Sequence, residues 1–296
     1  MATYTLTALE TGFVGAAEVY KKMLLGWDLR SVGAEIRTNV TTPQALAKFN
    51  TDSGPQPYRK QDDFNGGTFT DRTLTAYQAK YDQELDSEDF RNTYLATLPQ
   101  MPFEQYAVQQ GGQRFLDSLM RDVLWLGVRN GSGTAAADIC DGWGTIIAAE
   151  ITGSAITPVT TGALSGSNAV TKVEEVYDAS DVILKRMPSI MWCSYTVFRY
   201  YMQHYRTLNT YGFKPDATGK YILDGTQCEL RPVAFMGTSG RLVMTLPNNF
   251  VFGTDTENLA NYPTRHLNLL RNRILFPAGC QIKDIGAEVL VVNDQA

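Results

Sequence analysis

The stretch that decides the fold is IRTNVTTPQALAKFNTDSGPQPYRKQDDFNGGTFTDRTLTAYQAKYDQEL, residues 36–85. An outgoing arm leads into a tip rich in Gly, Pro, Asn and charged residues, where no apolar periodicity is present, and a return arm follows. The end of the return arm predicts a strand with two different faces. One face carries Tyr77, Ala79, Tyr81 and Leu85, and the other carries Gln78, Lys80, Asp82 and Glu84.

This stretch is too long for a compact domain to bury. Residues 68–85, extended throughout, would span about 60 Å at roughly 3.4 Å per residue. A chain of this length folds into a globule about 50 Å across. We therefore expect the return arm to lie on a neighbouring molecule, which indicates an assembly rather than a ligand pocket.

Composition limits the possible partners. The chain has 296 residues, is 44% hydrophobic and carries a net charge of −5, so it can bury a large core but has no overall basicity that attracts nucleic acid or anionic lipid. No apolar run approaches the roughly 20 residues that cross a bilayer, and the start MATYTLTALE has no leader pattern. We expect a soluble, unexported protein. Four scattered cysteines without C-x-x-C spacing favour a reducing compartment.

The rest of the chain mixes helical and strand patterns, which predicts the α+β class. We expect a short helix after Ser87, a long amphipathic helix of about 28 residues from Pro102 to Asn130, and a helix over residues 171–188 with Val182 and Ile183 inward. A strand over residues 189–194 then precedes an aromatic helix over residues 195–209 and several short strands. The C-terminal stretch NLLRNRILFPAGCQIKDIGAEVLVV, residues 268–292, predicts two strands broken at Pro277, Ala278 and Gly279.

Several phrases stand in a characteristic order. The two-armed stretch runs on into DRTLTAYQAKYDQELDSEDFRNTYLA, and the long helix ends in a Gly-rich DGW turn. A helix-strand-helix unit precedes KYILDGTQCELRPVAFM and NNFVFGTD. In this order of elements the chain resembles the major capsid proteins of tailed bacteriophages, whose fold is called the Hong Kong 97 fold.

The resemblance implies a division of the chain. Residues 1–33 would be an N-terminal arm and residues 34–86 the extension loop. Residues 87–171 and 263–284 would form a peripheral domain with a long spine helix, and residues 172–262 and 285–296 an axial domain. Some members crosslink a loop lysine to an asparagine of a neighbour, but no spacing here marks such a pair, so we expect no covalent crosslink.

Enzymatic interpretations find weak support. His204 falls within the aromatic helix, where a core role is favoured, and His266 has no carboxylate or cysteine at metal-ligand spacing. Ser165 in GALSG misses the nucleophile-elbow pattern by one position. Gly131 and Gly133 imitate half of a dinucleotide fingerprint but follow a helix instead of opening one. We expect no enzyme activity, no catalytic residue, no cofactor and no metal.

Charged residues of the two-armed stretch have two interpretations. The acidic cluster Asp82, Glu84, Asp86, Glu88 and Asp89 could hold a divalent cation, but strand alternation and helix capping explain it better. The tip charges most often form a solvated loop, whereas in a shell they would meet a neighbour's surface. The candidate intersubunit contacts are Arg59, Lys60, Asp62, Asp63, Tyr77 and Tyr81.

The resemblance implies a structural function. The chain would be a major capsid protein that self-assembles into hexamers and pentamers, and these would form an icosahedral shell around double-stranded phage DNA without sequence-specific binding. A portal and a separate scaffold or decoration protein would be its other partners, no membrane would be involved, and assembly would take place in the host bacterial cytoplasm to give the virion. Two alternatives stay open: an encapsulin-like compartment shell, and an unrecognised soluble enzyme or ligand-binding protein.

Overall fold

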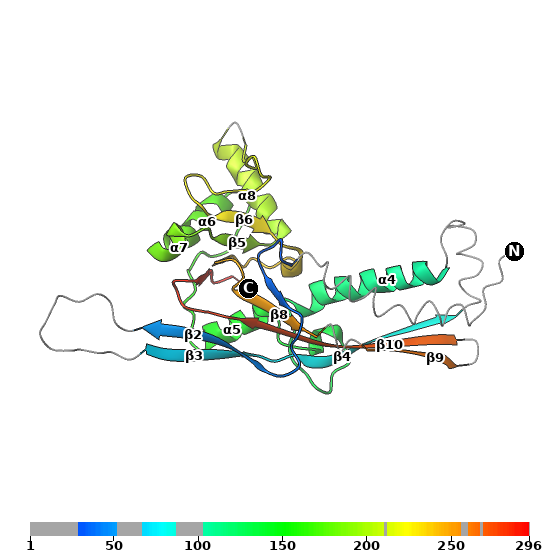
Figure 1. Cartoon of the computed structure of the whole chain (residues 1–296). Helices are drawn as coiled ribbons and strands as arrows, with labels where there is room; N and C mark the ends of the chain where they lie inside the picture. Colours follow the sequence, from blue (N-terminus) through cyan, green and yellow to red (C-terminus); the bar gives the residue numbers. More distant parts are fainter. Residues whose placement is uncertain are drawn as a thin grey trace, which may run out of the picture.

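The structure, a computed structural model, describes residues 29–51, 67–86, 103–209, 212–255, 260–266 and 269–295. An elongated body carries a five-stranded sheet, an upper lobe stands on it, and a two-stranded hairpin projects from one end (Figure 1). Helix and sheet are mixed throughout, which confirms the predicted α+β class.

The sheet of the body is built around one long strand, β10 (Leu269–Ile282). Strands follow the order β1-β8-β10-β4, and β9 also pairs with β10. Pairing is antiparallel except for β1 with β8, which is parallel. The other strands are β1 (Glu35–Arg37), β4 (Tyr77–Asp86), β8 (Phe250–Thr254) and β9 (Ala260–His266).

The expected break of the C-terminal stretch at Pro277 is wrong, because β10 continues through it. On one edge of β10 the partner strand β8 ends opposite Ala278, and β9 begins opposite Leu275. Pro277 lies in the gap between these partners, where a missing N–H is tolerated. Its carbonyl oxygen accepts a hydrogen bond from the Thr254 hydroxyl at 2.8 Å. One strand therefore joins the distal part of the sheet to its centre.

The predicted spine helix is present but shorter than expected. Helix α4 (Phe103–Ser118) continues as a π-helical turn, η1 (Leu119–Val123), and helical structure ends there rather than at Asn130. The Leu124 carbonyl oxygen, which follows η1, accepts a hydrogen bond at 2.8 Å from the amide of Trp143, the first residue of α5 (Trp143–Thr152). Leu126, within the range predicted to be helical, lies beyond the end of η1 and is exposed. A tertiary contact thus ends the helix before its sequence pattern does.

The upper lobe contains a second sheet of order β11-β7-β5-β6 with helices packed on it (Figure 1). Its elements are β5 (Ile190–Cys193), β6 (Glu229–Pro232), β7 (Val243–Thr245), β11 (Leu290–Val292), α6 (Ala169–Asp178), α7 (Val182–Arg186) and α8 (Tyr195–Leu208). The 3-10 turn η3 (Ala234–Met236) follows β6 in the chain, and the 3-10 turn η2 (Ala136–Asp138) lies between η1 and α5. The strand expected over residues 189–194 and the aromatic helix are confirmed.

The single helix expected over residues 171–188 is wrong, because α6 and α7 are separate. Ser180 donates its hydroxyl to the Tyr177 carbonyl oxygen at 2.6 Å, and the Asp181 carboxylate caps α7 by accepting from the amide of Ile183 at 2.7 Å. Such side-chain bonds to the backbone compete with continued helix. Val182 and Ile183 are exposed, not inward, because α7 starts in a new direction.

Body and lobe share an aromatic cluster. Trp192 of β5 packs 4.5 Å from Phe250 of β8 and 5.8 Å from Trp143 of α5, measured between ring centroids. Phe235 of η3 closes the cluster, 5.2 Å from Trp192. Both indole N–H groups are satisfied by backbone oxygens, that of Trp143 by Val251 at 3.2 Å. The cluster fixes how the lobe sits on the body.

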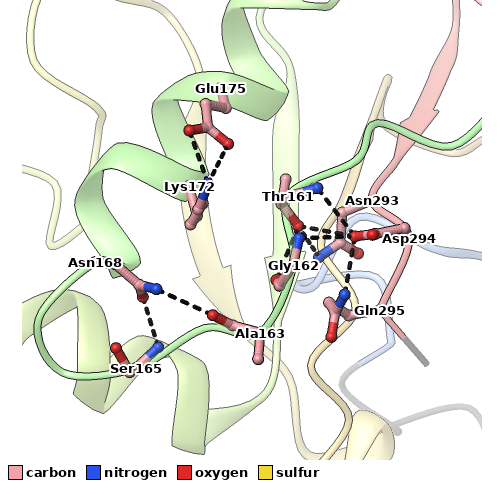
Figure 2. Close-up of polar contacts among 10 residues, drawn as sticks. All are labelled: Thr161, Gly162, Ala163, Ser165, Asn168, Lys172, Glu175, Asn293, Asp294 and Gln295. Atoms are coloured by element: carbon pink, nitrogen blue, oxygen red, sulfur yellow. Dashed lines mark hydrogen bonds and ion pairs between the residues drawn. The ribbon is translucent and has the colours of Figure 1, made fainter.

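The C-terminal segment is fastened to the upper lobe by a polar clasp (Figure 2). One carboxylate oxygen of Asp294 accepts hydrogen bonds from the Thr161 amide at 3.0 Å, the Thr161 hydroxyl at 3.1 Å and the Gly162 amide at 3.2 Å. Gln295 donates to the same oxygen at 2.9 Å. These bonds hold residues 161–162 beside the chain that follows β11.

We predict that Gly279→Ala destabilises the subunit. A Cβ at Gly279 would lie 2.1 Å from the Thr75 carbonyl oxygen, which is backbone and cannot move aside without disturbing the sheet. Overpacking of this kind costs about 1–3 kcal/mol. Urea unfolding of the isolated subunit measures it. Gly153→Ala is the matched control, because its nearest Cβ contact is 3.4 Å and its φ is −74°; equal midpoints for the two variants would contradict the prediction.

A second prediction concerns acid sensitivity. Hydrogen bonds from Gln295, Thr161 and Gly162 lower the pKa of Asp294 to about 2, below the value of about 3.9 expected in the unfolded chain. The ionised carboxylate therefore contributes stability above about pH 4, and this contribution is lost as the pH falls toward 2. Asp294→Asn should be less stable than the unaltered chain at pH 6, and the gap should close on acidification. A gap independent of pH in urea titrations would contradict this.

Candidate assembly surface

The hairpin is the part of the described chain that extends farthest from the body on its side (Figure 1). Strands β2 (Gln44–Thr51) and β3 (Gly67–Leu74) form a two-stranded sheet of their own. They pair antiparallel in a register that places Leu46 opposite Arg72 and Phe49 opposite Phe69. Since side chains alternate along a strand, the hairpin has two faces with separate contacts.

One side of the hairpin, the anchored face, packs on the body through Leu46, Leu74, Lys48 and Arg72. Leu46 and Leu74 are buried in a small apolar cluster with Val40 and Val251. A Cβ added at Gly253 of β8 would lie 2.9 Å from a Leu74 methyl carbon, so the hairpin root approaches the sheet closely. The root is therefore held at a defined place.

Two ion pairs extend the anchored face. Lys48 pairs with Asp284 at 2.6 Å, just beyond the end of β10. Arg72 pairs with Glu150 of α5 at 2.7 Å and also donates to the Gln281 side-chain oxygen of β10 at 3.2 Å. Each strand of the hairpin thus has its own polar link to the body.

The opposite side, the displayed face, carries Ala45, Ala47, Phe49 and the residues opposite them. Phe49 and Phe69 form a cross-strand pair with ring centroids 4.7 Å apart. The two residues are 53% and 71% exposed. This exposed aromatic pair on the projecting hairpin makes the displayed face the candidate interaction surface. These two phenylalanines were not singled out by sequence reasoning, because their pairing depends on a register that the sequence does not show.

The second half of the return arm behaves differently from the expectation. Its alternation is confirmed, with Ala79 buried, Tyr77 and Tyr81 half-buried, and Asp82 exposed. However, β3 ends at Leu74, and β4 pairs with β10 of the same chain at ten positions. The expectation that residues 68–85 form one extended arm on a neighbour is therefore wrong beyond Leu74. Of the described part of this stretch, β2 and β3 project from the body and β4 lies in its sheet.

The candidate contacts on β4 face their own subunit. The Arg129 guanidinium lies over the Tyr77 ring, 4.4 Å from its centroid. Tyr81 packs edge-on against Phe115 of α4 at 5.6 Å, and burial raises the pKa of its hydroxyl. A role of these tyrosines in subunit contacts stays a prediction. The candidate tip charges Arg59, Lys60, Asp62 and Asp63 lie outside the described residues.

Two acidic residues of β4 are paired across the sheet. Asp82 meets Arg273 at 2.7 Å, and Glu84 meets Arg271 at 2.6 Å. The hydrogen bond from Arg273 lowers the pKa of Asp82. Among the residues that the structure describes, no three His, Cys, Asp or Glu side chains gather as a metal site would require. Sequence reasoning missed these arginines because β10 lies almost two hundred residues further along the chain.

The residues considered for chemistry take structural positions. His204 is buried in α8, and its Nδ1 accepts a hydrogen bond from the Val170 amide at 3.0 Å, in accord with the expected core role. Ser165 donates its amide to the Asn168 side chain at 2.7 Å in the turn before α6 (Figure 2). All four cysteines are buried free thiols. Within the described ranges, no helix has the length and apolar character that crossing a bilayer requires.

Solved structures with the same architecture are phage and related capsids. A chain of the satellite phage P4 procapsid, in a structure that includes the size determination (Sid) protein, matches with a TM-score of 0.58 at 10% identity, covering 93% of this chain and 97% of that chain. A chain of the native GTA particle capsid matches with a TM-score of 0.53 at 12% identity, covering 90% and 89%. The capsid of Ralstonia phage GP4 gives a TM-score of 0.50 at 11% identity, covering 86% and 83%.

These likenesses show the fold. The chain has the fold of phage capsid proteins, and the predicted Hong Kong 97-like fold class is confirmed. No protein-family model matches the sequence, and no curated protein matches it. Identity near 10% means that the shared architecture is built from largely different residues.

Proposed function

We propose that this chain is a major capsid protein, which self-assembles into hexamers and pentamers that close into an icosahedral shell around double-stranded phage DNA. The observation that carries the proposal is the exposed Phe49–Phe69 pair on a hairpin that projects from a capsid fold. Its partner is another copy of the same chain. The chain acts as a structural subunit, through its contacts with other copies, and performs no catalytic step.

The proposal assigns a task to each part of the molecule. The hairpin is the core of the extension loop, the sheet of the body with α4 forms the peripheral domain, and the upper lobe forms the axial domain near the capsomer centre. The hairpin lies at one end of the body and the β4–β10–β9 strands at the other (Figure 1). A contact between unlike ends is heterologous, and such contacts close into rings when the rotation fits.

The energetics favour many modest contacts. Full burial of a phenylalanine side chain stabilises by about 1.5–3 kcal/mol, and Phe49 and Phe69 have roughly half or more of that surface still to bury. Exposed ion pairs contribute about 0–1 kcal/mol each. The aromatic pair is therefore the strongest contributor among the described residues of the hairpin, and symmetry repeats it around the shell. Portal, scaffold or decoration proteins and assembly in the bacterial cytoplasm belong to the same proposal.

Replacing both phenylalanines by serine tests the proposal. Because both rings point away from the body, the Phe49→Ser/Phe69→Ser subunit should keep a near-native circular dichroism spectrum and unfolding midpoint. Shells should be lost or should fall apart on mild heating, as seen by negative-stain microscopy and size-exclusion chromatography. Ala47→Ser, on the same face, is the control. Shells of unchanged yield and heat resistance from the double variant would refute the role of the pair.

Shortening the hairpin tests the surface as a whole. A Gly-Ser turn in place of residues 50–67 leaves both anchoring ion pairs and the apolar root intact, so the subunit should fold. Closed shells should not form, and soluble subunits or isolated capsomers should accumulate. An unfolded subunit would show that the tip belongs to its own core, which would contradict the proposal.

A further inference from the structure

Arg72 occupies an unusual position in the hairpin. It lies on the anchored face opposite Leu46 and next to the buried Leu74 in the alternation of β3. Its guanidinium reaches Glu150 on α5 and Gln281 on β10, so one side chain joins three elements that are far apart in the sequence. Gln281 in turn donates to the Thr73 carbonyl oxygen at 2.8 Å. We call Arg72, Glu150 and Gln281 the root clamp.

Desolvation of the charged groups in the root clamp costs free energy, so stability alone explains the clamp poorly. The Arg72 and Glu150 side chains are only 21% and 25% exposed, and the Nε of Arg72 is buried without a hydrogen-bond partner. Replacing a buried ion pair by apolar residues is often neutral or stabilising, whereas a planar guanidinium imposes direction. Leu46 and Leu74 already supply the apolar contact. What Arg72 adds is orientation.

The orientation of the hairpin matters because a small tilt at its root displaces the aromatic pair farther out. The Phe49–Phe69 rung lies three residues beyond the Leu46–Arg72 rung, which is about 10 Å at roughly 3.4 Å per residue, so a tilt of about 10° at the root moves the aromatic pair by about 2 Å. The apolar root has four buried residues, and apolar contact imposes no direction of its own. Lys48 pairs with Asp284, but a lysine is a point charge on a flexible stem and imposes less direction than a guanidinium.

We propose that the root clamp is a positioning device, in which Arg72 fixes the direction of the hairpin relative to the body and thereby the angle at which one subunit meets the next. Loss of the clamp leaves the subunit folded but widens the range of hairpin directions relative to the body. Since closure of a ring or shell depends on the rotation between neighbours, a swinging hairpin yields particles of mixed size and open forms. The mixed particle sizes rest on the function proposed above, whereas the change in hairpin direction does not.

Spin labels measure the hairpin direction directly on the full chain. Cysteines introduced by Phe69→Cys and Arg121→Cys lie at exposed positions on the hairpin and on η1, while the four native thiols are buried and resist labelling. The unassembled labelled subunit is isolated by size-exclusion chromatography before the measurement. Adding Arg72→Met or Glu150→Ala should shift and broaden the distance distribution between the labels. Arg273→Met, which removes an ion pair on the sheet away from the hairpin, is the matched control and should leave the distribution unchanged.

Shell size supplies the second measurement, made without the labels. Arg72→Met and Glu150→Ala subunits should keep near-native unfolding midpoints and assemble into particles of mixed size, whereas the unaltered chain should give uniform shells. An unchanged distance distribution for both clamp variants would overturn the proposal. If Arg72→Met fails to fold while Glu150→Ala keeps a narrow distribution, the clamp is only a structural anchor and the proposal is also overturned. Failure of the unaltered chain to form shells would instead refute the proposed function and leave the spin-label result standing.

Discussion

The sheet shared by two cores is the constraint on which the rest of the structure depends. Along β5, Ile190 and Trp192 enter the core of the body, while Met191 and Cys193 enter the core of the upper lobe. β7 and β11 divide their side chains in the same way. A sheet buried on both faces has to satisfy its backbone internally and cannot shift without opening both cores. Lobe and body therefore behave as one rigid unit that presents the hairpin.

The hairpin differs from this sheet, because only one of its two faces is covered. A two-stranded sheet alone is at best marginally stable in water. Leu46 and Leu74 secure it against β8, and the ion pairs at Lys48 and Arg72 continue the contact outward. The period of two that buries these residues brings Phe49 and Phe69 to solvent. The alternation of side chains along β2 and β3 therefore produces both the anchored face and the displayed face.

Apolar and polar contacts have different tasks at this surface. In the proposed assembly, burial of the phenylalanine rings would supply attraction that is roughly proportional to area and has no direction. Ion pairs near the surface add little free energy but prefer defined geometries, above all where a guanidinium takes part. An assembly that repeats one contact by symmetry needs both properties, since an error in angle accumulates from subunit to subunit.

Local patterns in the sequence predicted much of this molecule. The α+β class, the alternation of β4, the strand around Trp192 and the helix that contains His204 all depend on neighbours within a few residues, and the structure confirms them. The break between α6 and α7 was also local, since Ser180 and Asp181 carry its signal, but the surrounding apolar residues outweighed it in the prediction.

The sequence by itself indicated the mixed α+β class and several of the strands and helices, and their order resembled the capsid fold. Only the tertiary structure decided that β4 pairs with β10, that β10 passes through Pro277, and that the spine helix ends where α5 begins. The same holds for the Phe49–Phe69 pair and for the partners of Arg72. The physical reason is that pairing partners, register and the face a side chain occupies are set by contacts between segments far apart in the chain, which no local pattern records.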